Sequence, residues 1–257
     1  MNLNNNSQEY DDPTLYDKEN ESFIHEIPFI LKWATKKQGP IIDIACGTGR
    51  VTIPLAKNGY NLVGVDINEG MLAHAKKKAA NLNLQIRWIE QDCTQLDLCI
   101  KSNLVYSVGN SFQHFLTNES QDGLLTSINK SLEVEGLFIF NTRFPSVEEL
   151  LQPSTEEYWK SYTDNETLNT VDLFTISEYD SLKQIQHYTT IRKYKNNAGE
   201  IIKEKRTNIS LRYVFPQEME RLLFAFGFEI LHQYSDWNET PITNDSYELI
   251  YVCRKIR

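Results

Sequence analysis

Hydrophobic and polar positions follow two different periods along the first part of the chain. Between Leu15 and Lys37 apolar residues recur every three or four positions, which predicts one or two amphipathic helices with a break or restart at Pro28. Short apolar runs then alternate with longer periodic stretches. The runs predict strands at 41–45, 61–67, 84–92, 103–111 and 136–143, and the stretches predict helices at 50–58, 68–82 and 120–133. This alternation is typical of an α/β fold with a doubly wound, Rossmann-like parallel sheet.

The pattern changes after about residue 145. Three β-rich runs follow at 171–180, 184–195 and 201–215, and the turn 196–200 with Gly199 between the last two suits a hairpin. A helix at 216–228 and strands at 229–237 and 246–255 end the chain. We therefore expect a main domain of residues 1–145 and 216–257, with an inserted small antiparallel β lid of residues 146–215. Residues 1–13 are expected to be a frayed tail.

Composition narrows the choice of partners. The 257 residues are 40% hydrophobic and 24% charged, as in ordinary globular proteins, and the formal net charge of -9 argues against nucleic acid as a partner. No apolar run approaches a membrane span, and the polar N-terminus does not resemble a signal peptide, so a cytoplasmic monomer or homodimer is expected. The four cysteines lack C-x-x-C spacing; we expect them to be reduced and mostly buried, and no metal site is predicted.

The segment "IIDIACGTGR", residues 41–50, is the strongest chemical signal. In a parallel sheet, ligands bind beyond the carboxyl ends of the strands, and Gly47 and Gly49 allow the backbone to turn tightly and approach a ligand. A dinucleotide fingerprint would need a third glycine where Thr52 stands, and a P-loop would need lysine followed by serine or threonine. An ordinary strand-to-helix turn is the alternative.

Acidic residues end the next two predicted strands. Asp66 closes "LVGVD", where a carboxylate can accept hydrogen bonds from both hydroxyls of a ribose, and Asp92 closes "IRWIEQD", where it can accept one from an exocyclic amine such as that of adenine. Each aspartate could instead cap a helix. Polar groups at three successive strand ends favour a nucleoside-containing ligand.

As a set, "IIDIACGTGR", "LVGVDINEGML", "WIEQDCTQLDL" and "LVYSVGNSFQHF" resemble successive motifs of the class I S-adenosylmethionine-dependent methyltransferases. The resemblance implies a seven-stranded sheet with an antiparallel last strand and S-adenosyl-L-methionine as cofactor. Ala45 stands where the family usually has its first glycine, a departure expected to have little effect. The residues that the resemblance assigns to the cofactor are Asp43, Ala45 and Gly47 at the methionine end, Asp66 at the ribose, Ile67 at the adenine face, Asp92 and Cys93 at the adenine edge, with Gly49, Arg50 and Gly109 alongside.

The stretch "GNSFQHF" after the fourth strand is similar to the corresponding loop of sugar N,N-dimethyltransferases, and the predicted lid resembles those of such enzymes and of glycine N-methyltransferase. The resemblance makes His114 and Tyr16 the candidate catalytic residues. Histidine, with an ordinary pKa near 6.5, suits removal of a proton from an amine or hydroxyl, although a packed structural histidine is the alternative. Residues that could contact the acceptor are Asn110, Gln113 and Arg143 at strand ends, and Tyr188, Arg212 and Tyr213 in or near the lid.

The hypothesis is a small-molecule methyltransferase that acts on a nitrogen or oxygen nucleophile. An RNA or protein methyltransferase is an alternative, which the acidic composition disfavours, and the N-P-P-Tyr/Phe sequence of amide and nucleobase amino methyltransferases does not occur. A cofactor-binding protein without catalysis is a second alternative. A nicotinamide oxidoreductase is disfavoured by the missing third glycine.

Overall fold

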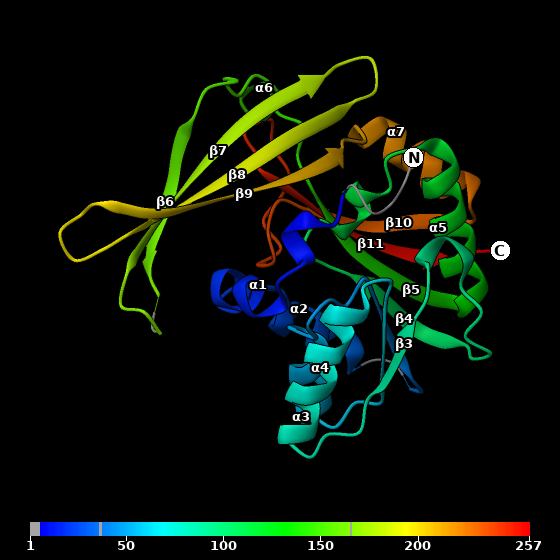
Figure 1. Ribbon diagram of the computed structural model, residues 1–257. Coiled ribbons are helices and arrows are strands. Elements are labelled where there is room, and N and C mark those ends of the chain that lie inside the picture. Colours follow the sequence, from blue (N-terminus) through cyan, green and yellow to red (C-terminus); the bar gives the residue numbers. More distant parts are fainter. Residues whose placement is uncertain (1–5, 36–37, 165) are drawn as a thin grey trace. The chain divides into compact units, whose positions relative to one another are not determined.

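The computed structural model describes residues 6–35, 38–164 and 166–257, which form two compact units (Figure 1). The α/β unit comprises residues 10–146 and 213–257, and the β unit comprises residues 147–212 together with the described residues 6–9. The chain therefore passes from the β unit into the α/β unit between residues 9 and 10, leaves it after residue 146 and returns at residue 213.

The α/β unit contains a seven-stranded sheet in the order β10-β11-β5-β4-β1-β2-β3. Its strands are β1 (Ile41–Ile44), β2 (Leu62–Asp66), β3 (Arg87–Glu90), β4 (Ser102–Ser107), β5 (Leu132–Arg143), β10 (Phe228–Tyr234) and β11 (Glu248–Lys255). The first five pair in parallel, whereas β11 runs antiparallel to both β5 and β10. The predicted doubly wound sheet with an antiparallel last strand is confirmed. All its parallel strands end at one edge.

Helices cover both faces of this sheet. They are α1 (Pro13–Asn20), α2 (Glu26–Ala34), α3 (Thr52–Lys57), α4 (Glu69–Asn81), α5 (Asn118–Ser131) and α7 (Pro216–Ala225), with 3-10 turns η2 (Gln8–Tyr10), η3 (Cys93–Gln95) and η4 (Ser111–His114). Buried side chains of α2 and α3 form a core on one face, and those of α5 and α7 form a core on the other. The first predicted helical region is indeed two helices, but they separate before Glu26 and Pro28 lies within the first turn of α2.

The β unit is an antiparallel sheet in the order β6-β7-β8-β9, preceded by the short helix α6 (Val147–Leu150). Its strands are β6 (Glu157–Thr163), β7 (Thr170–Asp180), β8 (Ile185–Lys195) and β9 (Ile201–Arg212). The sequence predicted the last three and missed β6, because this edge strand is mostly exposed and lacks a buried apolar alternation.

Residues 6–9 bind along β9, so the expectation of a frayed tail is wrong for this segment. The side chain of Asn6 accepts a 2.6 Å hydrogen bond from the amide of Ser210 and donates a 2.9 Å bond to its carbonyl. Glu9 forms a 2.7 Å ion pair with the buried Arg192. Side-chain amides that bond the backbone in this way occupy part of the edge of β9 that a further strand would otherwise use. Residues 1–5 lie outside the described residues.

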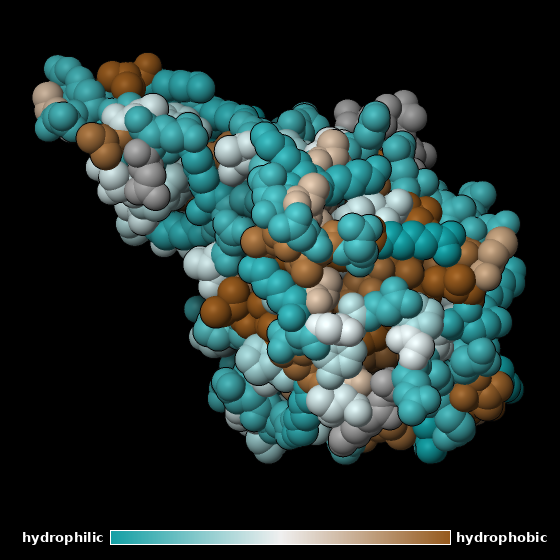
Figure 2. Space-filling view, turned by 90° about the horizontal axis from the view of Figure 1, so that it is seen from below, coloured by the Kyte–Doolittle hydropathy of each residue, from teal (hydrophilic) through white to brown (hydrophobic). Residues whose placement is uncertain are grey.

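The face shown in Figure 2 is mostly hydrophilic, with hydrophobic residues in separate groups. Among the described residues, no helix is long and apolar enough to cross a membrane, and no cluster of His, Cys, Asp and Glu could hold a metal ion. The cysteines are unpaired, as predicted. Three are buried and one is exposed: Cys46, Cys93 and Cys253, and Cys99, respectively.

Candidate functional site

The glycine turn after β1 places alternate residues in the left-handed backbone region. Ala45, Gly47 and Gly49 have φ angles of +56°, +54° and +75°. At Gly49 a Cβ atom would also lie 2.8 Å from the ring of Trp88, so both the backbone angle and the packing require glycine there. Ala45, which stands where the family usually has its first glycine, adopts a conformation that glycine adopts more readily, so the alanine adds some backbone strain here.

Asp66 ties this turn to the end of β2. Its Oδ2 accepts a 2.7 Å hydrogen bond from the amide of Gly47, and its Oδ1 accepts a 2.9 Å bond from the amide of Asn68. Burial raises the pKa of Asp66 and outweighs these backbone bonds, which lower it. A carboxylate offers about four acceptor sites, so two more donors such as ribose hydroxyls can bind here. The next residue, Ile67, is 51% exposed and offers an apolar surface.

Asp43 is a buried acid inside β1. It is 2% exposed, and its Oδ2 accepts a 2.5 Å hydrogen bond from the hydroxyl of Thr52. Among the described residues no donor reaches its Oδ1 with good hydrogen-bond geometry, although the hydroxyl of Tyr106 is close enough to act on the carboxyl group. Burial raises the pKa of Asp43 to about 7, more than the hydroxyls of Thr52 and Tyr106 lower it. A positively charged ligand nearby would stabilise the carboxylate form.

Asp92 caps the turn η3. Its Oδ1 accepts 2.8 Å bonds from both the amide and the hydroxyl of Thr94, which is the capping role named as the alternative to adenine binding. Cys93 follows and is buried, and this burial raises the pKa of its thiol to about 12. The thiol is therefore neutral at physiological pH and acts as a small apolar side chain.

Arg50 links the glycine turn to the N-terminal helices. Its guanidinium pairs with the buried Glu26 of α2 and donates to the carbonyl of Phe23. Arg50 also acts on the nearby Tyr16: burial raises the pKa of this phenol, and the guanidinium partly offsets that rise. A Cβ at Gly109 would lie 3.7 Å from Nη2 of Arg50. The guanidinium thus lies between the turn after β1 and the turn after β4, which places Tyr16 on the same side of the sheet edge as the glycine turn.

His114, at the end of η4, bonds to a tyrosine that the sequence did not single out. The hydroxyl of Tyr10 lies 2.9 Å from Nε2 of His114, and the two rings meet edge to face. Tyr16, the tyrosine that the sequence predicted to act with His114, packs against the other residue of this pair: its ring centre lies 5.7 Å from that of Tyr10. Burial, and secondarily the charge of Arg143, lowers the pKa of His114 to about 4, so the imidazole is neutral at physiological pH.

The turn that carries His114 is clamped to β5. Gln113 is 1% exposed, and its Oε1 accepts a 3.0 Å hydrogen bond from the amide of Arg143. Gln113 therefore anchors η4 and does not present its carbonyl to an acceptor. Asn110, which begins the turn, exchanges two hydrogen bonds with Asn141 of β5.

Two of the residues suggested as acceptor contacts, Tyr188 and Arg212, lie on opposite faces of the sheet in the β unit. The β8–β9 register pairs Tyr188 with Ile209 and Ile185 with Arg212, so Tyr188 and Arg212 point to opposite faces of the sheet. The hydroxyl of Tyr188 donates a 2.5 Å hydrogen bond to Glu149 within the β unit. Tyr213 is fully buried in the α/β unit.

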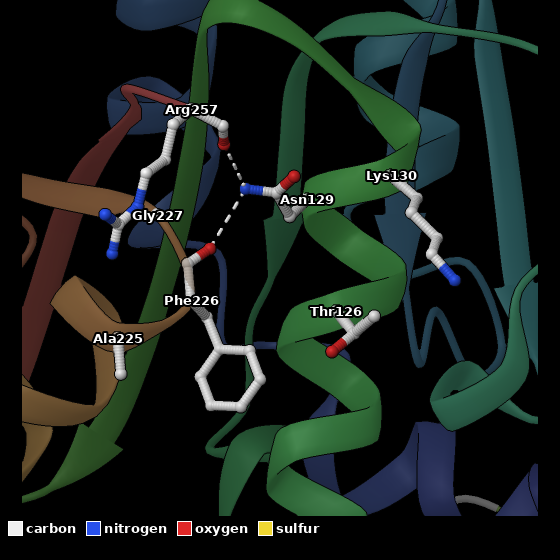
Figure 3. Close-up of a pocket in the computed structure, with 7 residues that line it drawn as sticks. All are labelled: Thr126, Asn129, Lys130, Ala225, Phe226, Gly227 and Arg257. Atoms are coloured by element: carbon white, nitrogen blue, oxygen red, sulfur yellow. Dashed lines mark hydrogen bonds between the residues drawn. The ribbon is translucent and has the colours of Figure 1, made fainter.

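A hollow of about 280 Å³ lies at the ends of α5 and α7 (Figure 3). Its lining residues are Thr126, Asn129, Lys130, Ala225, Phe226, Gly227 and Arg257. Figure 3 shows the side chain of Asn129 joining two segments: it donates to the carbonyls of Phe226 and Arg257 at 3.0 and 2.9 Å. Helices α5 and α7 end where β5 and β10 begin, so this hollow lies away from the edge that carries the glycine turn.

Comparison with known proteins relates part of this chain to methyltransferases. Residues 41–136 match the model of a methyltransferase domain. A Geobacillus sp. protein named as a methyltransferase is 32% identical over 39% of this chain and 41% of its own length. Glycine/sarcosine N-methyltransferase of Halorhodospira halochloris is 24% identical over 92% of this chain and 81% of its own.

Solved structures share the whole architecture. An S-adenosylmethionine-dependent methyltransferase from Clostridium acetobutylicum has a TM-score of 0.78 at 19% identity and covers 94% of this chain and 96% of its own. CalS10, an amino pentose methyltransferase from Micromonospora echinaspora solved with S-adenosylmethionine bound, has a TM-score of 0.73 at 16% identity. The match covers 94% of this chain and 95% of CalS10. At these identities the likeness establishes the fold.

Proposed function

The chain carries a class I S-adenosylmethionine-dependent methyltransferase domain, and on that premise we propose that it methylates a nitrogen or oxygen atom of a small molecule. The observation that carries this proposal is the 2.9 Å contact between Tyr10 and His114 at the turn after β4, the strand next to β1 in the sheet. A phenol and a neutral imidazole at this edge can orient a polar nucleophile.

The residues around the glycine turn fit the cofactor. S-adenosylmethionine supplies a methyl group on a positively charged sulfur, together with an ammonium group. Asp43 has a buried carboxylate oxygen that no donor among the described residues reaches with good hydrogen-bond geometry, and a raised pKa that a nearby cation would lower. Asp66 would accept the ribose hydroxyls and Ile67 would cover one adenine face. We propose Arg50 and Gly109 as further contacts, and Asp92 and Cys93 as the adenine edge.

The Tyr10–His114 pair would position the acceptor. A neutral His114 can accept a hydrogen bond at Nε2 from the hydroxyl of Tyr10, and the phenol oxygen can in turn accept a hydrogen bond from an N–H or O–H group. Methyl transfer requires the nucleophile to be in line with the carbon–sulfur bond, and such positioning is worth roughly 7–11 kcal/mol. With its lowered pKa, His114 serves better as an orienting acceptor than as a strong base.

An amine on a small polar molecule is the acceptor class that the relatives support. The names of two similar proteins specify a glycine or sarcosine nitrogen and an amino pentose. The net charge of -9 disfavours RNA. We further propose that residues 146–215 form the subdomain that selects the acceptor.

The experiment is a methyl-transfer screen. Purified protein is incubated with methyl-labelled S-adenosylmethionine and, separately, amino sugars, glycine, other small amines, and RNA, and labelled product is measured. We expect transfer to one small amine or hydroxyl compound, a loss of about 100-fold or more in His114→Gln, and no loss in the control His25→Gln, whose ring makes no capping bond. Cofactor binding without turnover on any acceptor, or an unaffected His114→Gln, would favour a non-catalytic binding protein. Labelling of RNA would instead support an RNA methyltransferase.

A further inference from the structure

A chain of side chains joins three neighbouring strand ends of the α/β unit behind the turn that carries His114. Asn141 on β5 donates a 2.9 Å hydrogen bond to Oδ1 of Asn110 and a 2.5 Å bond to Oε1 of Glu248, at the start of β11. Its own Oδ1 accepts a 3.2 Å bond from the amide of Asn110. Both amide hydrogens and the carbonyl of Asn141 are thus in use, and this side chain is 2% exposed.

Asn110 needs this support because of its backbone. With φ 60° and ψ 23° it is left-handed, and it follows Gly109, which is left-handed too. Asparagine tolerates this region better than other non-glycine residues, but the conformation persists only where the surroundings hold it. From Asn110 the chain enters η4, which ends at His114. The backbone orientation of Asn110 therefore helps to set the position of the His114 imidazole relative to Tyr10.

The carboxylate of Glu248 fixes the orientation of the side-chain amide group of Asn141. Burial raises the pKa of Glu248 to about 7. Above that pH its carboxylate is ionised and only accepts hydrogen bonds, so the atom of Asn141 that faces it must be the NH2 group. The carbonyl of Asn141 is then available for the amide of Asn110. Without an acceptor at position 248, the amide group of Asn141 can turn over, and a buried N–H group would lose its partner.

We propose that Glu248 is a positioning residue for His114, acting through Asn141 and Asn110 to fix the turn after β4. This inference rests on the role proposed above for His114. It predicts that the Tyr10–His114 geometry depends on a side chain two strands away, on a strand that bears none of the residues assigned to the cofactor.

The test reads the imidazole directly and needs no acceptor. Nitrogen-15 NMR of histidine-labelled protein at pH 8, with the His114 signal assigned from His114→Gln, reports which ring nitrogen carries the proton. We expect a single tautomer in the wild type, the same spectrum in Glu248→Gln, whose amide oxygen can still accept from Asn141, and a mixture of tautomers in Glu248→Leu, as in Tyr10→Phe. The matched control is Glu229→Leu on β10, where the carboxylate is 48% exposed and pairs with Arg254 at the surface.

Asn110→Gly provides a second test should Glu248→Leu fail to fold. Glycine accepts the left-handed backbone without strain but lacks the side-chain oxygen that accepts from Asn141, leaving only the 3.2 Å bond of the backbone amide, so the single tautomer should again be lost. If Glu248→Leu or Asn110→Gly folds and keeps the wild-type His114 signal, Glu248 is only a structural residue and the inference is overturned. A failed methyl-transfer screen would leave this spectrum unchanged, so failure of the proposed function is distinguishable from failure of the positioning role.

Discussion

The amide of Gly47 donates a 2.7 Å hydrogen bond to Oδ2 of Asp66, so the glycine turn after β1 is held by the last residue of β2. This one carboxylate both shapes the turn and presents acceptor sites to a ligand. Shape and recognition at this edge of the sheet therefore fail together when the carboxylate is removed.

Asp66→Ala is expected to weaken S-adenosylmethionine binding by tenfold or more. The variant loses the acceptor for Gly47 and the acceptors for the ribose, and a hydrogen bond to a charged group contributes about 1.5–3 kcal/mol. Calorimetric titration with the cofactor measures the change. Asp97→Ala, an exposed acid after η3, should bind as the wild type does. Equal affinity of Asp66→Ala and wild type would remove Asp66 from the cofactor site.

Tyr10→Phe and Tyr16→Phe should have different effects. Tyr10 bonds to His114, so its loss should reduce kcat by about 100-fold while the cofactor Kd stays within twofold. Tyr16 lies near Arg50, so loss of its hydroxyl should raise the cofactor Kd instead. Single-turnover rates and cofactor titrations separate the two outcomes. If Tyr16→Phe lowers kcat with an unchanged Kd, and Tyr10→Phe does not, the catalytic assignment from sequence was right and ours is wrong.

Much of the α/β unit could be predicted from the sequence because its strands and helices have distinct apolar periods and its turns contain glycine. The seven strands of the sheet and its antiparallel last strand, β11, followed from the family resemblance and are confirmed, whereas the order of the strands was not predicted. The strand β6 could not be found, since its side chains are mostly exposed and mixed in polarity.

The local geometry of the site was less accessible. The motif positions led to Asp43, Asp66 and His114, but Tyr10 lies in a polar segment whose order comes from contacts distant in sequence, including its bond to His114. Glu26 gave no signal either, because a helix N-terminus commonly bears an acid for reasons unrelated to Arg50. The periodicity of a sequence does not report which distant side chain meets a given one.

Asp43→Asn is expected to raise thermal stability at pH 8 and to weaken cofactor binding. Burial raises the pKa of Asp43 in the folded state to about 7, whereas in the unfolded chain it has the ordinary value of about 4. The free energy of unfolding is therefore highest when the group is protonated in both states, and it falls as pH rises through 7 because the buried group must then ionise. Asparagine removes the charge, so the melting temperature of the variant should exceed that of the wild type by more at pH 8 than at pH 5.

Cofactor binding to the wild type should also release a proton below pH 7. A cation near Asp43 lowers its pKa, so affinity should fall as pH drops below about 7 and level off above it. Titrations in two buffers of different ionisation enthalpy count the protons released, and Asp43→Asn should release fewer. Identical proton release in both proteins would assign the linkage to another group.

Asp17 connects α1 to both the glycine turn and α4. It accepts a 2.5 Å hydrogen bond from Thr48, a 2.9 Å bond from His74 and a 2.7 Å bond from Lys78, and it is 8% exposed. Asp17→Ala removes this acceptor from Thr48 and His74, whereas Lys78 keeps its pair with Glu21. The loss should cost about 1–3 kcal/mol of stability and, because Thr48 lies within the turn, should also weaken cofactor binding several-fold.

Glu21, the residue that caps the C-terminal end of α1, is the matched control for Asp17. Its carboxylate is 62% exposed and pairs with the Lys78 ammonium at 3.0 Å. An exposed pair contributes about 0–1 kcal/mol, so Glu21→Ala should leave both urea denaturation and cofactor titration close to wild type. If Asp17→Ala loses stability but keeps full cofactor affinity, the contacts of α1 stabilise only its packing against α4 and do not shape the cofactor site. Loss of affinity in Asp17→Ala and not in Glu21→Ala would show that the position of this helix is part of the cofactor site.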